Sequence, residues 1–387
     1  MGRQAAVKEK DLINVQAAAF LRAVHGLKQE EIAGILGNVS QSHVSRLLRQ
    51  ARELGWLEVV YRFTGTDRLP PERLEYLRRL VESKGLDKVL KEIDVGSGVR
   101  VRRTLVIDSG TGTSRKAIDL RLTRLGAAAA GRLGELLQRS DVCAVTWGST
   151  VSHVVDGLAA APPHLAPGRT IRFVPVCAEP TEQASNRDTS SHLAQRLQRI
   201  LRASDPQPPS LTGVFALIPR RYRGAEAAVL RKFVDQAGSY REIFGTHTPL
   251  IDRVDSLLTS AGASRRVMGF VHEELLRAGS TPSKPLTSAK LSELVAGDIG
   301  GIIIPKPGLN AAARREVEQL AAMWTGVTLA HLLRIARQAD RTGRPGVILV
   351  ALGSDRAEIV AEAVRRGLVN ELIVDRQLAN ALTRLLS

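Results

Sequence analysis

The chain of 387 residues is long enough for two or three domains, and its formal net charge of +16 suits a polyanionic partner. The two cysteines, Cys143 and Cys177, lie in apolar runs without metal-ligand spacing, so we expect core thiols and neither a disulfide framework nor a metal site. The N-terminus lacks the apolar core of a signal peptide, and no uncharged apolar run reaches the roughly 18 residues of a membrane span. These features predict a cytoplasmic protein that does not insert into membranes.

Residues 11–25 predict a first helix with Leu12, Val15, Ala19 and Leu21 on its apolar side. Residues 28–54 predict two short helices joined by a tight turn at Gly37-Asn38. We expect Ser40 to cap the second helix, because its hydroxyl can accept a hydrogen bond from the first turn. The positions expected to face inward are Ile32, Ala33, Ile35 and Leu36 in the first of these helices, and Val44, Leu47, Leu48 and Ala51 in the second.

The second helix of this pair carries a polar outer face, which is what a reader of the DNA major groove needs. The side chains that we expect to contact DNA are Gln41, Ser42, His43, Ser45, Arg46 and Arg49. The alternative is an ordinary amphipathic hairpin with a solvated polar face. Net charge does not decide between them, since residues 1–60 carry only +2 and the remainder carries +14.

The segment after this pair predicts a small wing and a connection to the rest of the chain. Residues 56–63 alternate like a strand, residues 64–71 have linker composition, and a leucine stripe begins in the helix expected from residue 72. The predicted domains are therefore a helix-turn-helix domain over 1–63, a linker and connecting helix over 64–90, and a ligand-binding and oligomerisation domain over 91–387.

From about residue 88 the pattern alternates between strands and helices, which is typical of a parallel sheet covered on both faces. The predicted strands are 102–108, 142–148, 171–178, 211–218, 254–260, 299–304, 346–352 and 371–375. The predicted helices are 114–138, 149–160, 190–201, 225–237, 311–322, 326–337, 357–368 and 377–386. The fold class is α/β, with an N-terminal helix-turn-helix domain and a C-terminal Rossmann-like doubly wound domain.

Ligands of open α/β sheets bind at the carboxyl ends of the strands, and one such junction is informative here. Gly148, Ser149 and Thr150 end a strand and begin a helix, an arrangement that can cradle an anion such as phosphate. Further candidates are Arg356 at a second junction, and Asp298 with Lys306. Each also has a structural interpretation: a strand–glycine–helix turn, a solvated arginine, and a turn-capping aspartate.

Catalytic motifs are not apparent: the sequence contains no Walker A, G-x-S-x-G or H-E-x-x-H pattern. Isomerase or deaminase chemistry would need a general base, for which Asp252, Asp255 and Asp298 are the candidates. We expect no catalytic residue, metal or cofactor, and an enzyme carrying a DNA-binding appendage is the alternative.

Two distant parts of the chain together resemble the SorC family of bacterial sugar-responsive transcriptional regulators. The segment QEEIAGILG…VSQSHVSRLLRQARELGWLEV is similar to the DNA-binding domain of that family. The motifs VTWGST and AGDI, and the ending VALGSDRAEIVAEAVRRGLVNELIVDRQLANAL, match motifs of its C-terminal part. The resemblance covers nearly the whole chain.

This resemblance implies binding of double-stranded operator DNA and of a sugar or phosphorylated sugar, in a C-terminal domain similar to sugar-phosphate isomerases, within a homo-oligomer that is usually a tetramer. It assigns Gly148, Ser149 and Thr150 to the phosphate-binding turn, Asp298 to the GDI aspartate, and Arg356 to a position where the family usually has lysine. The chain departs from the pattern by the extra Asn38, by SLLTSAGA (256–263), by GGIIIPKPG (300–308) and by Leu352. A constitutive DNA-binding oligomer without an effector is a further alternative.

Overall fold

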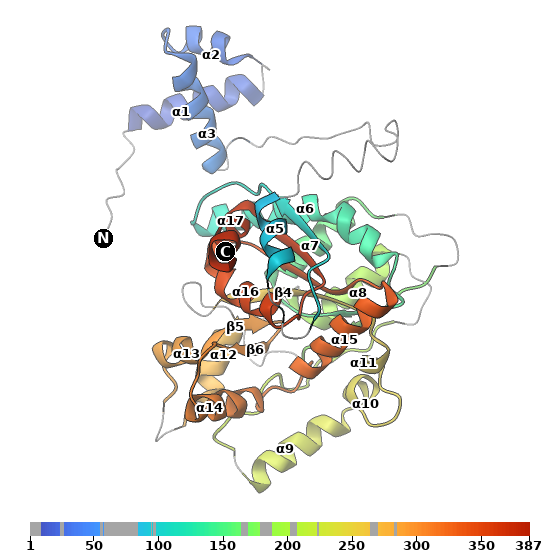
Figure 1. Cartoon of the computed structure of the whole chain (residues 1–387). Coiled ribbons are helices and arrows are strands. Elements are labelled where there is room, and N and C mark those ends of the chain that lie inside the picture. Colours follow the sequence, from blue (N-terminus) through green and yellow to red (C-terminus); the bar gives the residue numbers. More distant parts are fainter. Residues whose placement is uncertain are drawn as a thin grey trace. The chain divides into compact units, whose positions relative to one another are not determined.

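The computed structural model describes residues 9–23, 27–54, 57, 84–93, 95, 98–163, 169–178, 188–201, 207–222, 224–263, 270–281 and 285–387. The chain divides into two compact units, each considered by itself below. The helical unit comprises residues 1–76 with 110–121, and the sheet unit comprises residues 77–109 with 122–387. Figure 1 follows the chain through both.

The helical unit contains the three helices that the sequence predicts: α1 (Glu9–Ala23), α2 (Gln29–Ile35) and α3 (Gln41–Glu53). Each helix contacts the other two. They enclose a small apolar core of Val15, Ala18, Ala19, Ile32, Ala33, Val44, Leu47, Leu48, Ala51 and Leu57. The inward face of α3 is as predicted, but Ile35 is 59% exposed because it lies on the side of α2 turned away from this core, whereas the next residue, Leu36, packs against it.

The turn between α2 and α3 accommodates the additional residue with left-handed backbone. Gly37 has φ of 91° and Asn38 has φ of 59°, conformations that glycine and asparagine tolerate better than other residues. Val39 then donates its backbone N–H to the carbonyl of Ala33 at 3.2 Å and packs against the core. The extra Asn38 is therefore absorbed by the turn.

The predicted wing strand 56–63, apart from Leu57, lies outside the described residues, as do the linker 64–71 and residues 72–83 of the connecting helix. The boundaries proposed for the three domains therefore stay a prediction. Helix α5 (Lys84–Glu92) ends this connection and contacts α17 (Arg376–Leu386) in the sheet unit.

The sheet unit is built on six parallel strands in the order β1-β8-β7-β4-β2-β3. These are β1 (Arg103–Ile107), β2 (Val142–Val145), β3 (Arg172–Pro175), β4 (Ser256–Ala263), β7 (Gly346–Ala351) and β8 (Glu371–Asp375). Every residue of β2, β7 and β8 is buried, so both faces of the sheet are covered. The predicted α/β fold class with a helical N-terminus is confirmed.

Helices join and cover these strands much as the alternation predicts. In chain order they are α6 (Arg115–Leu137), α7 (Ser149–Ala160), α8 (Ser190–Ile200), α9 (Ala225–Gln236), α10 (Gly238–Phe244), α11 (Leu250–Arg253), α12 (Phe270–Gly279), α13 (Ser288–Leu294), α14 (Ala311–Ala321), α15 (Leu329–Thr342), the 3-10 turn η3 (Ser354–Arg356), α16 (Ala357–Arg365) and α17. The sequence interpretation assigned no element to α10–α13, and it began α15 three residues early.

Two predicted strands are wrong. Residues 299–304 do not form one strand, because Gly300 and Gly301, with φ of 56° and 94°, turn the chain between β5 (Val295–Ile299) and β6 (Ile302–Pro305). This hairpin adds to the end of β4 in antiparallel direction. Residues 211–218 contribute only an isolated bridge from Leu217 to Trp324, since Gly213 turns the chain and Phe215 points partly outward.

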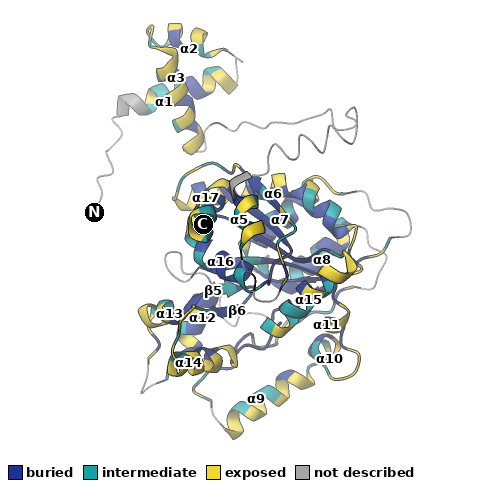
Figure 2. Ribbon diagram, in the orientation of Figure 1, coloured by how far each residue is buried: buried dark blue, intermediate teal, exposed yellow. Residues whose placement is uncertain are grey.

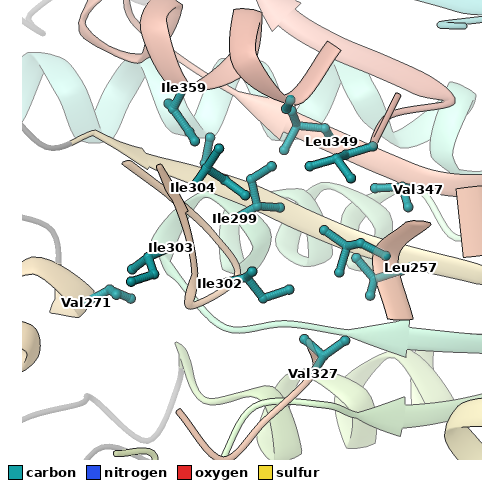
Figure 3. Packing of buried hydrophobic residues seen from close by; sticks show 14 of the residues in the cluster. Leu257, Val271, Ile299, Ile302, Ile303, Ile304, Val327, Val347, Leu349 and Ile359 are labelled. Carbon is teal, nitrogen blue, oxygen red and sulfur yellow. The ribbon is translucent and has the colours of Figure 1, made fainter. Parts of the chain in front are cut away.

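The main core of the sheet unit lies between the strands and helices, and it includes the hairpin (Figure 3). Ile299, Ile302 and Ile304 pack with Leu257 and Leu349 of the central strands in this cluster. Figure 2 shows the sheet in the buried colour and the outer helices with exposed faces. Cys143 and Cys177 are both buried free thiols, as the sequence predicts.

Among the described residues, the helices are all too short or too polar to cross a bilayer.

Asn370 is a buried polar link that we expect to stabilise the sheet unit. Its Oδ1 accepts the backbone N–H of Val347 at 2.9 Å, and its Nδ2 donates to the carbonyl of Ala336 at 3.1 Å. Asn370→Ala leaves the buried N–H of Val347 without its acceptor, and we expect it to lower the free energy of unfolding by about 1–3 kcal/mol. Asn380→Ala, at an exposed site on α17, should change it by less than about 0.5 kcal/mol. Denaturant titration checks both values, and equal effects would contradict the role of Asn370.

Candidate functional site

The first candidate site is the outer face of α3. Ser40 caps the helix as predicted, because its Oγ accepts the backbone N–H of His43 at 3.2 Å and also lies 2.9 Å from Oγ of Ser42. Arg46 donates from its guanidinium to Nδ1 of His43 at 3.2 Å. The proposed DNA contacts lie together on this face, where all are exposed except the half-buried His43: Gln41, Ser42, His43, Ser45, Arg46 and Arg49.

This face has the composition that a polyanion and base edges require. Gln41, Ser45 and Arg49 are spaced by four residues and therefore form one row along the helix. The buried side chains of α3 anchor the opposite side in the core of the helical unit. The arrangement leaves amide, hydroxyl and guanidinium donors on a rigid helix, which suits contact with a nucleic acid groove.

The second candidate site lies at the carboxyl ends of β2 and β4. Gly148 has φ of 117° and precedes α7, whose first turn includes the exposed Ser149 and the buried Thr150. The N–H of Gly148 donates to the carbonyl of Asp188 at 3.0 Å. The first-turn N–H groups of α7 have no acceptor within the helix, so this end favours an anion. The predicted strand–glycine–helix turn at 148–150 is therefore present, and its role as an anion cradle stays a prediction.

Helix α7 is positioned by close contact with α6. A Cβ on Gly126 of α6 would lie 2.1 Å from the carbonyl oxygen of His153, and a Cβ on Gly157 would lie 2.2 Å from the carbonyl oxygen of Gly126. The two helices therefore meet backbone to backbone at these glycines. This contact fixes the depth at which the first turn of α7 sits relative to the sheet.

Hydroxyl side chains at the ends of β2 and β4 lie next to this turn, and those of Thr146 and Thr259 are buried beneath it. An added Cβ on Gly148 would lie 3.4 Å from Oγ of Ser260, and Oγ1 of Thr146 lies 3.1 Å from Oγ1 of Thr259. The hairpin turn at Gly300 packs on these two threonines. We call Gly148, Ser149, Thr150, Ser260 and Asp298 the carboxyl-end site. Ser260 was missed in the sequence, although its place at the end of a predicted strand was a usable signal.

Asp298 enters this site from β5. It pairs with Gly262 of β4, and its Oδ1 accepts the N–H of Gly301 at 3.0 Å. Burial raises the pKa of Asp298 to about 6, while the hydrogen bond from Gly301 and the charge of Arg356 act in the opposite direction. Near neutral pH this carboxyl can therefore accept hydrogen bonds from hydroxyl groups, and below pH 6 it can donate one.

Arg356 lies beside Asp298, and its guanidinium is bound by other groups of the protein. Its Nε donates to the carbonyl of Ala261 at 3.0 Å, and its guanidinium also contacts the carbonyl of Leu352 and both carboxylate oxygens of Asp355. Behind it, the N–H of Gly353 donates to Oδ1 of Asp375, a second carboxylate that the sequence interpretation overlooked. Arg356 thus joins the ends of β4 and β7 next to the site.

The structure does not bring Lys306 to this group. Val295 pairs with Pro305, so Lys306 follows the open end of the hairpin, whereas Gly300 and Gly301 close it beside the site. Nζ of Lys306 lies 3.1 Å from Oε1 of Glu358 on α16. Its role as an effector contact stays a prediction that this ion pair does not support.

The three candidate general bases are also separated. Asp255 precedes β4, where its Oδ2 accepts the N–H of Asp141, and it therefore lies at the amino ends of the strands. Asp252 is exposed on α11, which precedes the same end. Only Asp298 lies at the carboxyl edge. The described residues contain no group of three or more histidine, cysteine or acidic side chains arranged to hold a metal ion.

Comparison with known proteins places this fold. Residues 100–203 match the family model described as "Putative sugar-binding domain". No curated protein matches the sequence. The structure is similar to the full-length sorbitol operon regulator SorC from Klebsiella pneumoniae, with 19% identity and a TM-score of 0.54 over 97% of this chain and 100% of that one.

Two further solved structures resemble most of the chain. A DeoR family transcriptional regulator from Listeria monocytogenes is 15% identical, with a TM-score of 0.52 over 79% of this chain and 99% of its own. The "Putative Sugar-Binding Domain of Transcriptional Repressor" from Vibrio fischeri is 18% identical, with a TM-score of 0.54 over 80% of this chain and 99% of its own. The SorC resemblance is confirmed for the fold of nearly the whole chain.

The raised pKa of Asp298 makes stability depend on pH in a defined direction. Because the native pKa of about 6 exceeds the ordinary value of 3.8, the folded state binds more protons than the unfolded state between these values. We therefore expect Asp298 to lower the free energy of unfolding as the pH rises from about 4 to 6. Asp298→Asn should remove this decrease, whereas Asp340→Asn at an exposed site should retain it. Urea unfolding at several pH values measures the slopes, and an unchanged slope in Asp298→Asn would contradict the assignment.

Proposed function

We propose that this protein is a sequence-specific DNA-binding transcriptional regulator whose operator affinity is controlled by a sugar or phosphorylated sugar bound in the sheet unit. The observation that carries the proposal is the outer face of α3, whose exposed Gln41, Ser45, Arg46 and Arg49 stand on a helix anchored in its own core. The same chain carries the match to a sugar-binding family model. The proposal follows from the two features occurring together.

DNA recognition would use α3 as the helix that enters the major groove. A single α3 reads only a few base pairs, so two copies related by symmetry would read the half-sites of a pseudo-palindromic operator. The proposed assembly is a homo-oligomer, a tetramer by resemblance to SorC regulators, working in the cytoplasm on double-stranded operator DNA. The names of the similar solved proteins, which include an operon regulator, support this role.

The effector would bind at the carboxyl-end site. The first turn of α7, with the hydroxyls of Ser149 and Thr150, offers donors to a phosphate or to sugar oxygens, and Asp298 offers an acceptor to sugar hydroxyls. Arg356 would keep Asp298 and the ends of β4 and β7 in place through its bonds to Ala261 and Leu352. A bound effector changes DNA affinity only by as much as its own affinity differs between the two states of the protein.

The DNA assignment predicts a specific loss on truncation of α3 side chains. Once operator fragments are obtained by selection, Arg46→Ala or Arg49→Ala should weaken binding by about 1–3 kcal/mol if the side chain reads a base, which is roughly 5- to 150-fold. A phosphate contact would instead reduce the slope of affinity against salt by about one. Fluorescence anisotropy measures both, with Gln16→Ala, exposed on α1, as the control. Unchanged operator affinity in both arginine variants would refute the assignment.

The effector assignment predicts that Thr150 matters only when ligand is present. A screen of sugars and sugar phosphates for shifts in operator binding supplies the ligand. Thr150→Val should weaken a phosphorylated effector about 10- to 100-fold, because one hydrogen bond to a charged group is lost, and should leave DNA binding without effector unchanged. Thr383→Val, on α17, is the matched control, since its hydroxyl bonds within its own helix. An equal effector response in Thr150→Val and the unmodified protein would remove the cradle proposal.

An enzyme similar to sugar-phosphate isomerases is the second candidate, and Asp298 is the feature that favours it. A carboxyl with a pKa of about 6 is suited to accept a proton near neutral pH. Turnover assays with the same sugar phosphates distinguish the two functions. Robust turnover that Asp298→Asn abolishes would establish catalysis and refute a role restricted to sensing.

A further inference from the structure

Helix α9 has many exposed residues (Figure 2), and some of them form an apolar stripe. Ala225, Val229 and Phe233 are spaced by four residues and lie on one side of the helix. Val229 is 66% exposed and Phe233 is 59% exposed, which are unusual values for large apolar side chains. Phe215, from the neighbouring segment, adds its ring to that of Phe233 at a centroid distance of 6.4 Å.

Besides the contact of Phe233 with Phe215, the described residues hold α9 to the sheet unit by the side opposite Val229. Val234 is buried there, and Arg231 donates to the carbonyl of Ala322 at 2.9 Å. A hollow of about 710 Å³ lies along one edge of the helix, lined by Ala227 and Ala228 among others, and another of about 280 Å³ lies along the other edge beside Leu230. The outer side of α9, which carries Val229, therefore faces away from the rest of the sheet unit.

We propose that this stripe is an interface between two copies of the chain, with the two α9 helices packed antiparallel about a twofold axis at Val229. The inference rests on the self-association in the proposed function and adds the surface that holds the copies together. It commits to a second copy because the sequence of α9 is complementary to itself when Val229 lies on the axis.

The complementarity concerns both charge and size. With Val229 opposite Val229 of the partner copy, Glu226 of one helix falls opposite Lys232 of the other, and the symmetry makes this ion pair twice. The small Ala225 falls opposite the large Phe233, again twice, so the aromatic ring meets a position with space beside it. Opposite charges and matched volumes at twofold-related positions are what an isologous interface requires.

The dimensions are also suitable. Twelve residues make a helix about 18 Å long, so the pair would bring roughly three turns of each helix together. Phe215 and the smaller hollow adjoin the stripe and extend the apolar surface beyond the helix. Burying this stripe removes from water the large side chains that are otherwise exposed, which favours association.

Analytical ultracentrifugation of the full-length chain without DNA tests the proposal. We expect the unmodified protein to be an oligomer, and Val229→Asp to halve its mass or to raise the dissociation constant at least tenfold. Leu385→Asp, at an exposed apolar site on α17, should leave the mass unchanged. A Val229→Asp variant with the unmodified mass would overturn the interface alone. A monomeric unmodified protein would overturn both the interface and the proposed oligomer.

A charge exchange confirms the register without disturbing apolar packing. Glu226 and Lys232 are both exposed, so their variants should fold. Glu226→Lys and Lys232→Glu should each raise the dissociation constant several-fold, because each places like charges opposite one another, and the double variant should restore it. A double variant no better than the singles would overturn the antiparallel register.

Cross-linking gives a direct readout of the axis. Cys143 and Cys177 are buried, so a cysteine introduced at the surface is the accessible thiol among the described residues. Val229→Cys should give a covalent dimer with a short bifunctional maleimide, since the two introduced thiols meet at the axis. Gln236→Cys, on the same side of α9 but away from the axis, should cross-link far less. Equal cross-linking at both positions, or none at position 229, would overturn the arrangement.

Discussion

The sheet unit depends on the double pairing of strand β4. Its first residues pair in parallel with β2 and β7 in the middle of the sheet, whereas Ala261, Gly262 and Ala263 continue past β2 and pair antiparallel with β5. One strand therefore belongs to the core and also carries the hairpin that lies over the carboxyl edge. A change in the register of β4 would displace the hairpin, Asp298 and the bonds of Arg356 together.

The two units differ in the size of their cores and in how their candidate sites are formed. The helical unit has a core of few side chains, and its polar face is formed by residues that packing does not require. The sheet unit has an extensive core, and its site is formed where regular hydrogen bonding stops, at strand ends and helix starts. Burial against the larger core raises the pKa of Asp298. A small helical core offers no such environment.

Much of the fold was predictable because local pattern and tertiary structure agree. The inward side of α3 followed from helical spacing, and the parallel sheet followed from alternation. The wrong predictions concern short apolar runs that are compatible with either a strand or a turn. Residues 211–218 have the composition of a strand, but Gly213 and the pairing of Leu217 with Trp324 give a turn and a single bridge. The Gly300-Gly301 pair between apolar runs was a hairpin signal, and its left-handed backbone explains why one predicted strand became two.

The sequence predicted where the backbone turn of the candidate site lies. It did not predict which groups its charged side chains contact. Gly148 and the start of α7 follow from the sequence, because a glycine between a strand and a helix is a local feature. The bond from Arg356 to Ala261 joins residues 95 positions apart, and the ion pair of Lys306 with Glu358 likewise depends on tertiary packing. A sequence pattern that names a charged residue does not reveal whether the protein itself uses that charge.

Gly262 and Asp298 form the tightest contact within this site. A Cβ on Gly262 would lie 2.1 Å from Oδ2 of Asp298, so a larger residue there would force the carboxylate to move from the position in which it accepts the N–H of Gly301. The place of the carboxylate therefore depends on the absence of a side chain at position 262. A larger residue at 262 would accompany either a different residue at 298 or a carboxylate turned to another position. Covariation between these positions would thus record whether a lineage still keeps a carboxyl at this end of the sheet.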